Sequence, residues 1–548
     1  LSVKSKSLDN SNKGILSSAA GQTLTLGESL NNNQGGLIDS GAALDITAGA
    51  LTNAGGTINA QEAINATATG LDNTAGSIAG NGAVTLDLLG ALTNTSGKLA
   101  GAGPVLIKRV TNLANQNGQL ASQSTLTLLT GSLDNSNNGT IAAKDALQIT
   151  ASGAAHNDAN GLIYSQNAGL NLKAASLANG KGAIQSQNGL TLDVSGDLDN
   201  QSGKVIAENG LVMVKAANID NRGGVLSSIK GALEARTVGV LRNGYDLNNR
   251  QGGIIQGQGL TLSALAGLDN NGGRISAQAT DASITTAAFD NRNGVLYAKG
   301  LAGVIGTSLD NGNGQIAGNR IDLSLSGALS NRTGIVESDT TLTVKAASVD
   351  NQTGRLRSLG NAGKTSFQIG GLLDNRNGVL ETANTDLTLA VGSFLNAGGQ
   401  LNHVGLGRFD ISTANVMGAG GGITTAGTLD LNADTWTNSS VIQAGRLNVN
   451  VGNFSQTTSG KLLASDYLQA RGGNWTNDGL IASDGVMDMQ LGGSYSGNGR
   501  MSSVGGLSLT AAQLNLSAAS SIAGGSDSTV KIGGQLTNAG RLTSNADL

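Results

Sequence analysis

Apolar and polar residues alternate in short runs along the chain, and residues 190–211 show the arrangement clearly. Every second residue of Leu190–Val194 is apolar, Leu198–Asn200 places its outer two residues on one face, and Lys204–Ala207 forms a third run. A period of two is typical of a half-buried strand. No sustained helical stripe of apolar residues accompanies it. The pattern therefore predicts about three strands of three to five residues in each unit, separated by corners rich in Gly and Asn.

The unit recurs in register, and an asparagine marks its position. Its motif is Leu-Asp-Asn, a few small residues and Gly, mostly repeated every 20 to 22 residues. The marks are Asn10, Asn32, Asn53, Asn73, Asn94, Asn115, Asn135, Asn157, Asn179, Asn200, Asn221, Asn249, Asn270, Asn291, Asn311, Asn331, Asn351, Asn375 and Asn396. Two intervals are longer, 28 residues from Asn221 to Asn249 and 24 from Asn351 to Asn375. We expect extra loop residues in both, the first of them near Ile229 to Asp246.

A unit this short buries little apolar surface alone, but coils stacked on one another share a continuous core. We therefore predict an all-β protein, a parallel, right-handed β-helix of about 26 coils of 20–22 residues. With adjacent coils about 4.8 Å apart, such a stack is roughly 125 Å long. The leucine-rich repeat has a similar period, but its Leu-x-x-Leu-x-Leu frame and helical return do not fit the Leu-x-Leu pairs of this chain.

The asparagine marks have two physical explanations. A corner residue often takes the left-handed conformation, which Asn tolerates well. Stacked Asn side chains also pair amide to amide and satisfy buried polar groups. Aspartate often precedes the mark and is expected to point outward; an arginine two residues on, as in Asp290-Asn291-Arg292, is expected to pair with it across coils. A calcium column or the carboxylates of a β-helical glycosidase are the alternative interpretations of these aspartates.

Composition agrees with an ordered repeat and narrows the chemistry. The chain has 84 Gly, one Pro, no Cys, 2% aromatic residues and a net charge of −4. Absence of Cys excludes disulfides and thiolate zinc sites, and the small charge without basic runs argues against nucleic acid. We predict no catalytic, cofactor or metal residues. His156 and His403 lie far apart, and Gly360–Thr365 is not a phosphate-binding loop because Ser358 stands where that motif needs Gly.

The motif changes past about residue 400. We divide the chain into regular Leu-Asp-Asn repeats over 1–400 and divergent, aromatic-marked coils over 401–548. Trp436 and Trp475 take the leucine position in two of the divergent units. Either these rings fill a wider core, or they belong to a segment that binds a partner.

Units such as Leu71–Ala79 and Leu268–Ala277 resemble the filamentous haemagglutinin repeat. That repeat builds the large exoproteins of bacterial two-partner secretion, which include haemagglutinin adhesins and contact-dependent growth inhibition toxins of the CdiA type. The resemblance implies a secreted or outer-surface location and export through an outer-membrane β-barrel transporter, recognised by a region absent from this chain. Because Leu8-Asp9-Asn10 already belongs to the repeat and no signal peptide precedes it, we expect a piece of a longer protein.

The resemblance implies a stalk that presents an adhesive or toxic tip to a receptor on a target or host cell. It slightly favours a growth-inhibition stalk over an adhesin that binds host surfaces directly. The alternative from another class is a β-helical polysaccharide-degrading enzyme. Such an enzyme needs a groove of clustered Asp, Arg and Lys, and the insertion near Ile229 to Asp246 is too small to build one.

Overall fold

The computed structural model describes residues 1–547, apart from the side chains of residues 415 and 417–419. Throughout this part of the chain every regular element is a β-strand. The chain divides into two compact units, Leu1–Thr286 and Ala287–Leu548. Each unit is a parallel β-solenoid, and the turns number about 26 in all. The predicted all-β, parallel β-helical architecture is confirmed.

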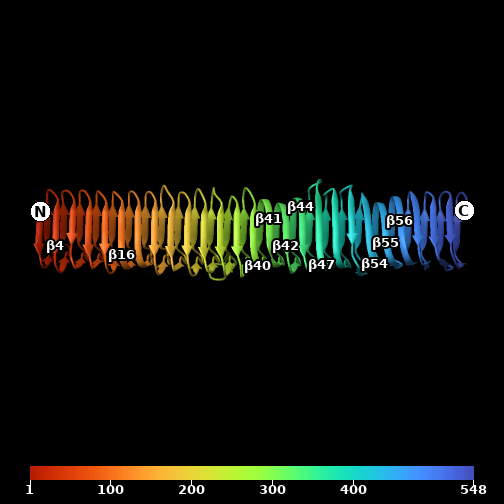
Figure 1. The fold of residues 1–548 in the computed structure, drawn as a ribbon, viewed down its shortest axis with the longest axis horizontal. Coiled ribbons are helices and arrows are strands. Elements are labelled where there is room, and N and C mark those ends of the chain that lie inside the picture. The colour runs from red at the N-terminus through yellow and green to blue at the C-terminus, as the bar shows by residue number, and fades with distance from the viewer. Residues whose placement is uncertain (548) are drawn as a thin grey trace. The chain divides into compact units, whose positions relative to one another are not determined.

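One coil of the first unit consists of β26 (Leu190–Val194), β27 (Leu198–Asp199) and β28 (Lys204–Ala207). The next coil repeats them as β29 (Val212–Ala216), β30 (Ile219–Asp220) and β31 (Val225–Ser228). Each strand pairs in parallel with its counterpart one coil further on. Figure 1 shows this stacking within the first unit as neighbouring arrows coloured from red to yellow-green. The three short strands predicted for this segment are therefore present, and only the second differs from its predicted bounds, since it ends at Asp199 and not at Asn200.

The core of each unit consists of columns of Leu, Ile, Val and Ala. In β26 the side chains of Leu190, Leu192 and Val194 are buried, while the residues between them are only partly covered. Leu190 pairs with Val212 in the next coil, so inward side chains lie above one another. Because a strand alternates its side chains between two faces, every coil adds its apolar face to the same interior.

Several strands of the second unit are longer than those of the Asn200 coil because they run through the corners. They include β41 (Val295–Asp310), β42 (Gln315–Leu325), β55 (Val441–Gln456) and β56 (Lys461–Asn477). The register between β41 and β42 shifts between Ala298 and Leu301, where the chain turns. The other strands labelled in Figure 1 are β4 (Gln22–Leu26), β16 (Val105–Ala114), β40 (Ala282–Asp290), β44 (Ile335–Ala346), β47 (Lys364–Asp374) and β54 (Thr428–Asn438).

Coils of the second unit continue on both sides of residue 400. There β48 (Val379–Thr382) pairs with β50 (Gln400–His403), and β50 pairs with β53 (Gly422–Thr425). The pairing is parallel throughout. The change of motif near residue 400 thus falls inside a series of paired coils, and the division into residues 1–400 and 401–548 stays a prediction.

Candidate functional site: the asparagine corner and the surface openings

Asn94 shows how the marked corner is built. Its Nδ2 donates to Oδ1 of Asn115 in the next coil at 2.7 Å, and to the carbonyl oxygens of Gly97 and Gln119 at 3.3 and 3.2 Å. Its Oδ1 accepts from Nδ2 of Asn73 at 2.7 Å. The side chain is fully buried. Each amide therefore links the coil before it to the coil after it.

We call the linked side chains the asparagine ladder. In the first unit it contains Asn10, Asn32, Asn53, Asn73, Asn94, Asn115, Asn135, Asn157, Asn179, Asn200, Asn221, Asn243 and Asn270. In the second unit it contains Asn291, Asn311, Asn331, Asn351, Asn375 and Asn396. Eighteen of the nineteen marks in the sequence series are members of it.

The exception is Asn249, which was wrongly predicted to belong to the series. Asn243 occupies that coil's place, since it accepts from Asn221 at 2.7 Å and donates to Asn270 at 2.8 Å. The leucine two residues before each candidate explains the difference. Leu241 is fully buried in the core, whereas Leu247 is 83% exposed. The extra residues of this coil accordingly follow Asn243 instead of spanning the predicted segment from Ile229 to Asp246.

The left-handed residue of the corner is not the asparagine. It comes two positions later, as at Ala75 (φ 52°) and Ser96 (φ 56°), and the ladder asparagines are absent from the described residues with positive φ. The glycine after it is required for space. A Cβ on Gly97 would lie 2.2 Å from the carbonyl oxygen of Asn73 and 2.7 Å from Oδ1 of Asn94. Amide pairing and close approach, not left-handed φ at the mark, thus account for the Asn and Gly of the motif.

The aspartate before the mark closes the same turn. Oδ1 of Asp199 accepts from the backbone N–H of Gln201 at 2.9 Å, which satisfies a donor at the corner. Arg292 pairs with Asp290 of its own coil at 2.6 Å and also with Asp310 of the next coil at 3.8 Å, so the expected cross-coil pairing is present beside a shorter pair within the coil. Partial burial works to raise the pKa of Asp290, but the hydrogen bonds from Arg292 outweigh it and leave that pKa below its usual value. A second cross-coil pair joins Arg332 to Asp350 at 2.5 Å.

In the divergent coils other side chains take over the ladder's role. Nδ2 of Asn438 donates to Gln456 at 2.9 Å, Gln456 donates to Asn477 at 3.0 Å, and Asn477 donates to the hydroxyl of Tyr495 at 3.0 Å. Burial raises the pKa of Tyr495. The recurring triplet of an aromatic residue, a small residue and an amide at Trp436 to Asn438 was the available signal for this continuation.

Trp436 and Trp475 are core residues, with 1% and 0% of their surface exposed. Nε1 of Trp475 donates to the carbonyl oxygen of Val451 at 3.1 Å, and its ring lies 4.5 Å from that of Phe454. No partner can contact these rings while the coils are folded. The interpretation of Trp436 and Trp475 as a partner surface is therefore wrong, and the wider-core alternative describes them.

His403 belongs to a second buried polar corner. Its Nδ1 lies 2.9 Å from the hydroxyl of Thr425, and its Nε2 lies 3.1 Å from the carbonyl oxygens of Asn384 and Thr385. Carbonyls only accept, so Nε2 carries the proton and Nδ1 accepts from Thr425. Burial lowers the pKa of His403, which favours this neutral form.

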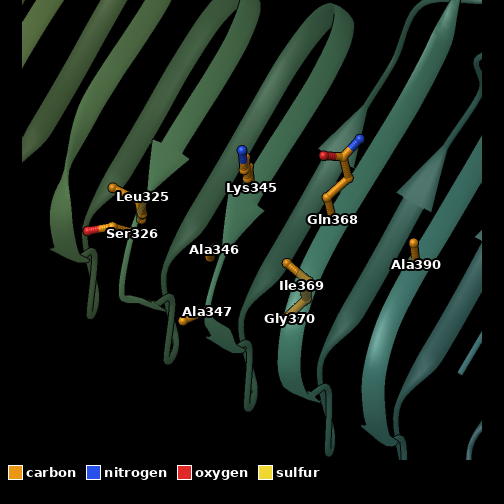
Figure 2. Close-up of a pocket in the computed structure, with 9 residues that line it drawn as sticks. All are labelled: Leu325, Ser326, Lys345, Ala346, Ala347, Gln368, Ile369, Gly370 and Ala390. Carbon is orange, nitrogen blue, oxygen red and sulfur yellow. The ribbon is translucent and has the colours of Figure 1, made fainter. Parts of the chain in front are cut away.

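The openings on the surface are shallow. One has a volume of about 430 Å³ and is lined by four adjacent coils of the second unit, in which Lys345 and Gln368 provide the longest polar side chains. Figure 2 shows both pointing away from the small residues Ala347 and Gly370 at the turns. Between residues 1 and 547 we find no group of three His, Asp or Glu side chains arranged to hold a metal ion. Among residues 1–547 the structure contains no helix that could cross a membrane.

Coils, ladder and corner define a repeat protein of the parallel β-solenoid class. A model of the haemagglutinin repeat matches it over residues 1–96, 99–163, 154–202, 200–236, 236–292, 274–333, 316–377 and 361–410. The chain therefore belongs to the haemagglutinin repeat family.

Among curated proteins, the chain is similar to one named deoxyribonuclease CdiA from Dickeya dadantii (strain 3937). The two are 30% identical over 257 residues, which is 45% of this chain. The chain spans only 7% of that relative's length. No solved structure matches the chain at a significant level.

Proposed function

We propose that this chain is a stalk segment of a two-partner-secretion exoprotein, located outside the cell and exported through an outer-membrane β-barrel transporter. The stalk holds an adhesive or toxic tip away from the producing cell and presents it to a receptor on a target cell. It is a structural element and not an enzyme. Membership of the haemagglutinin repeat family supports this proposal.

The observation that carries the proposal is the repetition of one set of bonds in coil after coil. Every coil around Asn94 adds three paired strands, a buried amide link and an apolar layer to its neighbours. Stability in such an array is a sum of coil and interface terms, so its length can grow without a new fold. A spacer needs this property, and a catalytic domain does not.

Between the two kinds of stalk we favour contact-dependent growth inhibition. The support is the 30% identity to the relative named deoxyribonuclease CdiA. An adhesin whose repeats bind the host surface directly is the second candidate, since the same family of repeats is found in haemagglutinin adhesins.

The test removes one coil in register from the full-length exoprotein. Deleting residues 95–115 joins Asn94 to Gln116 and preserves the ladder spacing, because Asn94 and Asn115 are 21 residues apart. We expect secretion and contact with target cells to persist, with reach shortened by about 4.8 Å. A deletion of residues 95–105, which breaks the register, is the matched control and is expected to abolish secretion of folded protein.

The purified chain, with residues 245–251 deleted, provides the second arm. If it competes with the full-length exoprotein for target cells, the segment itself is adhesive and the spacer proposal fails. Release of reducing sugar from acidic polysaccharides would instead support the alternative that the chain is a polysaccharide-degrading enzyme. The deletion removes the extra residues that follow Asn243 in its coil, so that they do not contribute to either assay.

A further inference from the structure

One coil of the first unit carries an insertion that no neighbouring coil has. Its corner glycine, Gly253, lies ten residues after Asn243, compared with three between Asn94 and Gly97. The inserted residues form a hairpin of β34 (Tyr245–Asp246) and β35 (Gln251–Gly252), an antiparallel pair in a unit whose other strands pair in parallel.

The hairpin is fixed against corners of earlier coils. Nδ2 of Asn249 donates to Oγ of Ser202 at 2.6 Å, and that hydroxyl donates to Oδ2 of Asp246 at 3.0 Å. Nε2 of Gln251 donates to the carbonyl oxygen of Gly223 at 3.1 Å. Ser202 belongs to the Asn200 coil, so the hairpin reaches back over more than one coil.

An open cavity of about 350 Å³ lies beneath this overhang, and its volume is within the size range of small-molecule sites. It is lined by Gly180, Lys181, Gln201, Ser202, Asp246, Asn248 and Asn249. Two solenoid corners form one side and the hairpin forms the other. The cavity exists only because the insertion is present, and its lining is mostly polar side chains.

The backbone of the cavity is not suited to a phosphate or another strong anion. Such ligands use unpaired backbone N–H groups, and here the N–H of Lys181 donates to Gln201 while that of Ser202 donates to Arg222. The cavity's two charged side chains, Lys181 and Asp246, have opposite signs. A neutral ligand therefore fits the lining better than a charged one.

Three side chains of the lining are free to bind such a ligand. Lys181, Gln201 and Asn248 have no hydrogen-bond partner for their side-chain polar atoms among residues 1–547. Asp246 is buried, with 7% exposed, and its carboxylate is held by Ser202 and by the backbone N–H of Asn248 at 2.9 Å. Amides and an ammonium group together offer donors and acceptors, and a ligand with several adjacent hydroxyls can use both.

We propose that this cavity binds one neutral sugar unit of a polysaccharide or glycan. Ring hydroxyls would take the place of water on the amides of Gln201 and Asn248 and on the ammonium group of Lys181. The lining contains no aromatic ring, so each site binds weakly, and a long polymer would gain avidity by meeting many copies of the exoprotein. The proposal does not depend on the stalk function.

Saturation-transfer NMR on the whole chain tests it. The probes are the methyl glycosides of glucose, galactose, mannose and N-acetylglucosamine, compared with glucuronate as an anionic probe and glycine as a zwitterionic probe. We expect at least one neutral glycoside to bind. In the double variant Gln201→Ala/Asn248→Ala its affinity should fall about tenfold, from the loss of two hydrogen bonds. Deleting residues 245–251 restores the three-residue spacing from Asn243 to Gly253 and should abolish binding.

Gln352→Ala is the matched control, because Gln352 follows Asn351 as Gln201 follows Asn200 but has no hairpin beside it. It should leave binding unchanged. The proposal is overturned if no neutral glycoside binds, if glucuronate or glycine binds more tightly, or if the deletion variant binds as well as the parent chain. Unchanged circular dichroism in all variants ensures that a loss of binding reports on the cavity and not on folding.

Discussion

Replacing Asn94 with Leu separates amide pairing from shape at the corner. Leu keeps the branching of Asn at Cγ but removes both polar atoms. The substitution takes away the donor to Oδ1 of Asn115 and the acceptor for Nδ2 of Asn73, both at 2.7 Å. Nδ2 of Asn73 keeps the carbonyl oxygens of Gly76 and Lys98 at 3.3 and 3.2 Å. Oδ1 of Asn115 loses the amide that donates to it.

The expected change in the free energy of local opening follows from the partners that Asn115 and Asn73 lose. Losing the bond to Asn115 leaves a buried acceptor without a donor, which costs about 1–3 kcal/mol, and losing the bond from Asn73 adds about 1 kcal/mol. We therefore expect Asn94→Leu to lower the free energy of local opening by about 2–4 kcal/mol. Asn65→Ala, which removes an exposed amide bonded to Asp45 at 2.9 Å, is the control and should change it by less than about 0.5 kcal/mol.

Native-state hydrogen exchange suits this measurement because it reports the opening of individual coils, whereas unfolding of a repeat array is not two-state. The double variant Asn94→Leu/Asn115→Leu sharpens it. The two single variants together leave two acceptors without donors, one on Asn115 and one on Asn135, but the double variant leaves only the one on Asn135. The double cost should be smaller than the sum of the single costs by about 1–3 kcal/mol. Additive costs, or a single cost no larger than that of the control, would refute the reasoning.

Three further outcomes follow from the same structure. Gly203→Ala should strongly destabilise its coil, because the new Cβ would lie 2.1 Å from a carbonyl oxygen. Gly180→Ala should not, because its Cβ would lie 3.7 Å from the nearest carbonyl oxygen, and hydrogen-exchange rates at the two corners measure the difference. Burial lowers the pKa of His403, so the corner around it should become less stable as pH falls below about 6.5, where the unfolded chain takes up a proton that the folded chain disfavours. The measurement is the pH dependence of coil opening, and the same dependence in His403→Gln would disprove this. Trp436 and Trp475 should emit at short wavelength and resist collisional quenchers until the chain unfolds, so quenching in the native protein would contradict their burial.

Much of the fold could be predicted because strand and corner signals are local. The alternation in Leu190–Val194 places inward and outward residues without knowledge of the neighbours. The fixed spacing of the marks then sets the register, and Leu198 pairs with Ile219 as the spacing from Asn200 to Asn221 requires. Because the unit is repeated, each coil supports independently the register predicted for the others.

Details of the corner depend on neighbouring coils and were not predictable from one unit. Asn243 and Asn249 both follow a leucine by two residues, and only the burial of Leu241 distinguishes them. The need for Gly97 comes from the carbonyl oxygen of Asn73, 24 residues away, which no local pattern encodes. The hydroxyl of Tyr495 accepts a hydrogen bond at the place where the earlier coils have an asparagine, so a chemically different side chain keeps the same link between coils.

Cysteine cross-linking tests the stacking of coils most directly, because the chain contains no cysteine of its own. Paired Cα atoms about 4.8 Å apart are within the range that a disulfide spans, and atoms two coils apart are not. We predict that Asn171→Cys/Thr191→Cys in the first unit and Asn448→Cys/Gln469→Cys in the second oxidise to intramolecular disulfides. Asn171→Cys/Met213→Cys, which joins positions two coils apart, should stay reduced. Disulfide formation by that pair, with none in the two adjacent pairs, would contradict the parallel register on which the account depends.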